Sequence, residues 1–125
     1  MFLDCVFLGL VLAAISGLPG LVWRRTPSGA ERLAAVLMAA AALCGLAGAA
    51  GGIVAADGGA RPFPWPAMGG GAVGLDPLSA FFLVPVFLLG GLGPLYGLAY
   101  WPQRRHPGNG RKLRACWGLL VAGMA

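Results

Sequence analysis

The sequence predicts an all-α fold, a polytopic transmembrane helix bundle with three complete helices and a truncated fourth. Hydrophobic residues make up 58% of the 125 residues and charged residues only 10%, whereas about 25% charged is usual in soluble domains. A soluble domain of this size could not cover its surface with so few charges. We therefore expect one membrane domain, residues 1–125, whose first partner is the lipid bilayer.

Three long apolar runs predict the complete helices, at residues 2–23, 33–56 and 77–101. At about 1.5 Å per residue, each run exceeds a hydrocarbon core of about 30 Å. The last apolar run, residues 113–125, reaches only about 20 Å and is too short to cross. We therefore expect the chain to be the N-terminal part of a longer polypeptide.

The first apolar run carries small residues at regular spacing. Gly9, Ala13 and Gly17 recur every fourth residue, which places them on one helix face where a second helix can approach closely. Pro19 and Gly20 predict a bend in the last turn. No Lys or Arg precedes the run, which is the reverse of the charge order in a signal peptide, so the segment is predicted to be retained.

The connections differ in character. Residues 24–32 form a short polar loop in which Ser28 and Glu31 have the spacing of a capping box for the second helix. Residues 57–75 form the longest connection, and its closely spaced prolines exclude a helix there. Residues 102–112 form a strongly basic loop before the last apolar run.

The basic residues predict the orientation. Three lie around the first connection, one in the second, and five around the third. Because Lys and Arg are retained on the cytoplasmic side, loops 24–32 and 102–112 should be cytoplasmic in a multi-pass inner (plasma) membrane protein. The N-terminus and the proline-rich connection should then lie outside. The same clustering explains the net charge of +5 better than a nucleic-acid-binding face does.

No catalytic, cofactor-binding or metal-binding residues can be assigned from the sequence, and no cofactor is expected in this chain. Cys5, Cys44 and Cys116 lie far apart, each inside an apolar run, which fits small buried side chains better than a zinc site or a disulfide framework. The glycines at 69–71 lack the Lys-Ser/Thr of a phosphate loop. No ionisable residue lies at the middle of an apolar run, where a proton path would place one.

From residue 74 onward the chain resembles a known family. The segments are GLDPLSAFFL, LYGLAYW and HPGNGRKLRACWGLLVAGMA. They resemble the N-terminal part of the antiporter-like membrane subunits shared by complex I (NADH:quinone oxidoreductase), Mrp-type cation/proton antiporters and membrane-bound nickel–iron hydrogenases. Within that superfamily the chain is most similar to hydrogenase-4 component B and formate hydrogenlyase subunit 3. The signature positions are Leu75, Asp76, Pro77, Leu78, Ser79, Tyr96 and Tyr100.

The resemblance implies a subunit that moves protons across the membrane, coupled to electron transfer in an oxidoreductase complex whose other membrane subunits are its partners. It also implies that the working residues, a Glu in the fifth helix and Lys residues in later helices, lie beyond Ala125. Asp76 is then either a proton-entry or exit group at the outer surface or a helix cap with Pro77, and its position at a helix start favours the cap. The alternative reading is a small structural or assembly membrane protein without transport activity.

Overall fold

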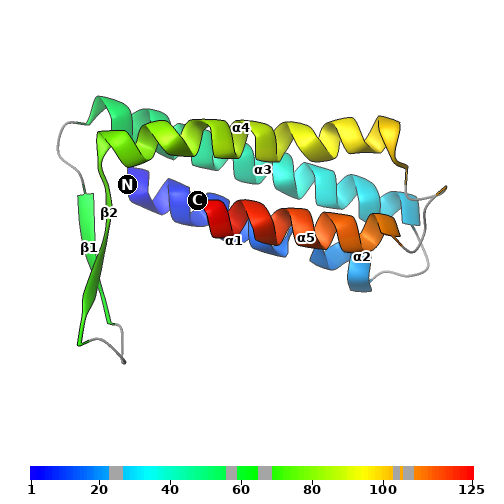
Figure 1. Ribbon diagram of the computed structural model, residues 1–125, viewed down its shortest axis with the longest axis horizontal. Coiled ribbons are helices and arrows are strands. Elements are labelled where there is room, and N and C mark those ends of the chain that lie inside the picture. The colour runs from blue at the N-terminus through cyan, green and yellow to red at the C-terminus, as the bar shows by residue number, and fades with distance from the viewer. Residues whose placement is uncertain (23–26, 56–58, 65–68, 103–104, 106–108) are drawn as a thin grey trace.

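The computed structural model describes residues 1–22, 27–55, 59–64, 69–102, 105 and 109–125. Five helices and one β-hairpin account for most of them (Figure 1). In chain order they are α1 (Phe2–Ile15), α2 (Leu18–Val22), α3 (Pro27–Val54), β1 (Gly59–Phe63), β2 (Gly71–Leu75), α4 (Pro77–Tyr100) and α5 (Asn109–Met124).

The helices form one bundle around α3, which packs against both α1 and α4, while α5 packs mainly against α1. The hairpin extends from the end of the bundle that holds the N-terminus, and α5 enters from the opposite end and stops partway along its neighbours (Figure 1). Among the described residues, three stretches are long and apolar enough to cross a membrane: Phe2–Val22, Gly29–Val54 and Pro77–Tyr100. The predicted all-α bundle with a shorter fourth helix is confirmed.

The first predicted helix is interrupted. α1 ends at Ile15 and α2 resumes at Leu18, so the break lies before the predicted bend at Pro19 and Gly20. The cause is Pro19, since its ring clashes with the carbonyl four residues earlier, that of Ile15, and it has no N–H to donate there. Ser16 closes the end of α1 by donating from both its N–H and its Oγ to the carbonyl of Ala13.

Two helices begin earlier than the apolar pattern predicted. α3 starts at Pro27 instead of residue 33, and α5 starts at Asn109 instead of residue 113. Part of each predicted loop, 24–32 and 102–112, is therefore helical, because a helix needs apolar residues only where it meets lipid. Proline also suits the first helical position, where its missing N–H costs nothing. α4 begins at the predicted residue 77, ends at Tyr100, one residue before the predicted 101, and stays continuous through Pro85 and Pro94.

The long connection, residues 57–75, contains a β-hairpin that was not predicted from the sequence. β1 and β2 pair antiparallel, from Gly59 opposite Leu75 to Phe63 opposite Gly71. Gly69 and Gly70 precede β2 with φ of +74° and +127°, a backbone region that only glycine adopts readily. These glycines therefore serve a turn, and the predicted absence of a helix in this connection is confirmed for its described residues.

Small residues bring the helices into close contact, as predicted for the face of Gly9, Ala13 and Gly17. A Cβ on Gly9 would lie 2.9 Å from the carbonyl oxygen of Ala41 in α3. A Cβ on Gly17 would lie 2.3 Å from the Cα of Ala115 in α5. The one face therefore serves two neighbours, with its first residue against α3 and its last against α5.

Gly45 of α3 lies between two helices. Its backbone is within 3.1 Å of the position that a Cβ on Gly9 would take, and its own Cβ would lie 2.4 Å from the ring of Phe87 in α4. Phe87 and Met38 are the largest fully buried side chains. The bundle is therefore held by backbone proximity and ring packing at its centre, as expected of helices that associate in lipid.

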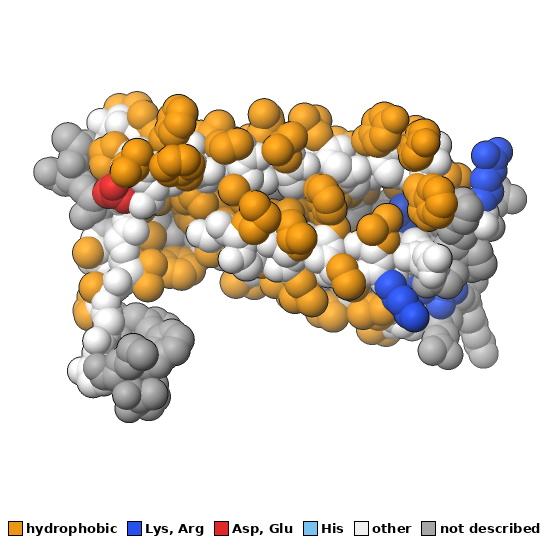
Figure 2. Space-filling model, in the orientation of Figure 1, with side chains coloured by type: hydrophobic (Ala, Val, Ile, Leu, Met, Phe, Trp, Pro, Cys, Tyr) orange, Lys and Arg blue, Asp and Glu red, His pale blue; other side chains and the backbone are white. Residues whose placement is uncertain are grey.

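The surface is divided by polarity. On the face shown in Figure 2, hydrophobic side chains cover the length of the bundle, and the visible Lys and Arg side chains gather at the end opposite the hairpin. We call this the basic end, defined by the starts of α3 and α5 and the end of α4, and the other the hairpin end. An apolar belt between two polar ends is the arrangement that suits a bilayer.

Candidate functional site

A buried ion pair lies at the basic end. The guanidinium of Arg114 in α5 donates from Nη2 to Oε1 of Glu31 in α3. Only 10% of the Arg114 side chain and 6% of the Glu31 side chain are exposed. A charge is buried only when it is paired, and this pair connects α5 to the first turns of α3.

The pair corrects one sequence prediction. Glu31 was expected to cap a helix starting near residue 33, but it lies inside α3 and binds an arginine 83 positions later. The Ser28 side chain, the other half of the predicted capping box, lies outside the described residues. Both charges flank the long apolar runs, which is why no ionisable residue was predicted in their middle.

The surroundings of the pair are packed and largely satisfied. Trp117, one turn beyond Arg114, donates from Nε1 to the carbonyl oxygen of Gly90 at 3.1 Å. Ser16 lies 3.6 Å from the sulfur of Met38. Arg111 differs, because its buried Nε finds no acceptor among the described residues. The pair itself holds helices together, and its two charges cancel.

The signature residues gather at the start of α4. Asp76 is the N-cap, and its Oδ1 accepts a hydrogen bond from the N–H of Ser79 at 3.2 Å. Pro77 occupies the first helical turn. Leu75 is buried in the core, whereas Leu78 is exposed. Each of these side chains therefore has a local structural role, except Leu78, which faces outward.

Hydrogen bonding from Ser79 lowers the pKa of the Asp76 carboxyl below its usual value. A carboxylate that accepts such bonds at a helix start is stabilised in its charged form. Asp76 therefore stays ionised at neutral pH, which suits a cap better than a group that exchanges protons there.

The two signature tyrosines lie at the other end of α4. The rings of Tyr96 and Tyr100 stack with centroids 5.5 Å apart and planes 19° apart. Both side chains are mostly exposed, and they lie one helical turn apart at the basic end. Exposed aromatic rings at this position are typical of the interface between lipid and water.

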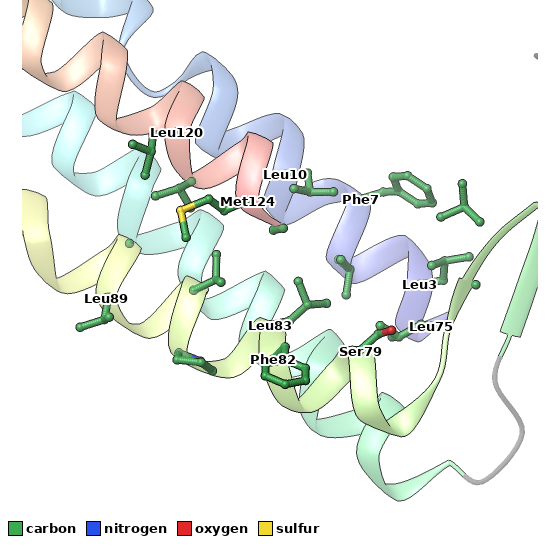
Figure 3. A pocket seen from close by; sticks show the side chains of 18 of the residues that line it. Leu3, Phe7, Leu10, Leu75, Ser79, Phe82, Leu83, Leu89, Leu120 and Met124 are labelled. Carbon is green, nitrogen blue, oxygen red and sulfur yellow. The ribbon is translucent and has the colours of Figure 1, made fainter.

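A large apolar groove opens at the hairpin half of the bundle, between α1, α4 and the C-terminal end of α5 (Figure 3). Its volume is about 780 Å³ and it is lined mainly by aliphatic and aromatic side chains. Leu3, Phe7, Leu83 and Met124 line it, and Ser79 contributes a hydroxyl. No charged side chain lines this groove among the described residues, so it suits hydrocarbon rather than ions.

A second, smaller groove lies at the basic end between α4 and α5. Its volume is about 280 Å³. Gly97 and Gly110 contribute backbone to its walls, and Trp101, Arg114 and Trp117 contribute side chains. Apolar walls, two indole rings and the paired Arg114 guanidinium thus line one groove.

The hairpin is tied to α1 by charge. Arg61 of β1 binds Asp4 of α1 through both guanidinium nitrogens, at 2.7 and 3.0 Å, and the N-terminal amine lies 3.0 Å from the same carboxylate. The Asp4 and Arg61 side chains are 46% and 60% exposed and Met1 is more exposed still, so the contact contributes little to the stability of the bundle.

The described residues contain no group of three or more His, Cys, Asp or Glu placed to hold a metal. The three cysteines are free, with Cys116 exposed and the others partly buried. Comparisons of the chain with protein-family models, with characterised proteins and with solved structures find no match.

Proposed function

We propose that this chain is the N-terminal segment of a proton-translocating membrane subunit in a hydrogenase or complex-I-like oxidoreductase. The support is the signature segment at the start of α4, where Asp76 caps the helix directly after β2, together with the stacked tyrosines at its other end. The role of this segment is to support the ion-conducting helices. The two charges of its buried ion pair cancel and serve to join α3 and α5.

The proposal is tested in membranes of the cells that encode the chain. A tagged chain should co-purify in mild detergent with subunits that carry redox centres. Deleting its gene should abolish proton uptake driven by hydrogen or NADH in inverted vesicles, while uptake driven by ATP hydrolysis continues. Purification without redox subunits, together with unchanged redox-driven uptake, would contradict the proposal.

A structural or assembly protein without transport activity is the second candidate. The ion pair favours it, because Glu31 and Arg114 bind each other across α3 and α5. In this case deletion would lower the amount of assembled complex, and the remaining complex would pump protons with unchanged stoichiometry. Measuring protons moved per electron in the deletion strain therefore separates the two candidates.

We further propose that the basic end faces the cytoplasm of a plasma (inner) membrane and that the hairpin end faces outward. In a chain without its natural cysteines, Lys112→Cys at the basic end and Val73→Cys in the hairpin place exposed thiols at opposite ends. A membrane-impermeant maleimide should label Val73→Cys in intact cells and Lys112→Cys only after the membrane is opened. The reverse pattern would contradict this orientation.

A further inference from the structure

The β-hairpin leaves strand edges open at one end of the bundle. Among the described residues, β1 and β2 form a sheet of two strands, and this ribbon projects from the side of the bundle (Figure 1). A sheet of only two strands is marginally stable in water. Its outer edges carry backbone N–H and C=O groups that can pair with a further strand. The edges of the hairpin are therefore candidate contact surfaces.

Pro62 of β1 decides which backbone groups point outward. It lies opposite Ala72 and has no N–H to donate to β2, so this pair is of the non-hydrogen-bonded kind. The two kinds of pair alternate along an antiparallel ladder, so Ala60 and Gly74 form the other non-hydrogen-bonded pair. The N–H and C=O groups of Ala72 and Gly74 therefore point away from β1, along the outer edge of β2.

The outer edge of β2 is better suited to accept a strand than that of β1. On β1, Pro62 offers no donor at the outer edge, and proline at an edge discourages strand addition. β2 has no proline and no charged residue, and its first four residues are exposed. It also contains Gly71 and Gly74, and glycine in a strand is common where another backbone comes close. β2 thus lacks the features that protect an edge.

The geometry of a second copy fits this edge. Two copies in one membrane share one orientation, so a twofold axis between them runs along the membrane normal. The hairpin runs across the long axis of the bundle (Figure 1), so this axis makes two β2 strands antiparallel. With Val73 opposite its own copy, Ala72 of each chain lies opposite Gly74 of the other, and both have outward-pointing backbone groups. The edge is therefore complementary to itself.

We propose that this chain forms a homodimer in the membrane by joining the outer edges of two β2 strands into one continuous sheet. The strand order is then β1, β2, β2 of the second copy and β1 of the second copy. No charged side chains oppose each other across the new pairing, because β2 carries none, and the central pair of valines is favourable across strands. The proposal does not depend on the function proposed above.

The test is disulfide cross-linking of the full chain, with its natural cysteines replaced, at low density in phosphatidylcholine vesicles. Val73→Cys should give a covalent dimer on oxidation, because the Cα atoms of a non-hydrogen-bonded pair lie about 4.5 Å apart, within the reach of a disulfide. Ala72→Cys alone and Gly74→Cys alone should stay monomeric, since each residue is then diagonal to its own copy, at about 7–8 Å. A mixture of these two variants should cross-link. Gly74 has no positive φ, so it can take a side chain.

Two proline variants test the edge itself in the Val73→Cys chain. Ala72→Pro removes an outward-pointing N–H from β2 and should abolish the covalent dimer. Ala60→Pro makes the same change on the outer edge of β1 and should leave the dimer unchanged. Equal cross-linking of the three single-cysteine chains would indicate random collision and overturn the proposal, as would a Val73→Cys chain that stays monomeric. These comparisons need no proline variant, so they hold even if Ala72→Pro fails to fold.

Discussion

The buried ion pair between α3 and α5 gives the sharpest test of how this bundle is held together. Replacing Glu31 with Gln keeps the side-chain shape and removes the carboxylate charge that the buried Arg114 guanidinium binds. Removing one partner of a buried pair costs about 3–5 kcal/mol. Because the two side chains are only 6% and 10% exposed, water can offset little of that cost.

The measurement is a double-mutant cycle. Glu31→Gln, Arg114→Met and the double variant are unfolded reversibly in mixed micelles by increasing the fraction of sodium dodecyl sulfate, and far-ultraviolet circular dichroism follows the loss of helix. Each single variant should lose about 3–5 kcal/mol. The double variant should lose less than their sum, with a coupling energy of up to about 3 kcal/mol, since neither charge is then left alone.

Arg32→Gln is the matched control, because Arg32 is the next residue in the same helix but is exposed. Its unfolding free energy should stay within about 0.5 kcal/mol of the unaltered chain. If the two single effects simply add, or if Glu31→Gln behaves like the control, the pair does not hold α5 in place and the reasoning fails.

Three further predictions concern a helix contact, a helix cap and a helix break. Gly45→Ala should lower the unfolding free energy by about 1–3 kcal/mol in the same assay, because its Cβ would lie 2.4 Å from the Phe87 ring. The control, Gly123→Ala, adds its Cβ in open space and should be neutral or stabilising by up to about 1 kcal/mol. Equal effects of the two substitutions would contradict this prediction. Asp76→Ala should destabilise the start of α4 and Asp76→Asn much less. Because the folded-state pKa of Asp76 is lowered, its contribution to the unfolding free energy is complete above the unfolded pKa and is lost as pH falls through the folded pKa. An acid titration in which the Asp76→Asn chain loses as much stability as the unaltered chain would contradict this. Pro19→Ala should join α1 and α2 into one helix, visible as helical Cα chemical shifts across the break, and a persisting break would show that another contact causes it.

The sequence predicted best those structural features that depend on residues close together along the chain. Helix existence, the third helix range and the cap at Asp76 follow from apolar run length and from Pro77 at the helix start. The resemblance to antiporter-like subunits stays a proposal, since its residues have local structural roles here. The starts of α3 and α5 were misplaced because hydropathy reports where lipid begins, whereas a helix can continue past that point through charged residues.

The sequence by itself determined that this chain needs lipid, how many long helices it forms, and which end carries the positive charge. Only the tertiary structure decided which residues meet. Glu31 and Arg114 are separated by most of the chain, and their contact depends on where α5 lies against α3, which composition does not encode. The groove beside Trp117 arises in the same way, since an open space between two helices is a property of their packing and of neither helix alone.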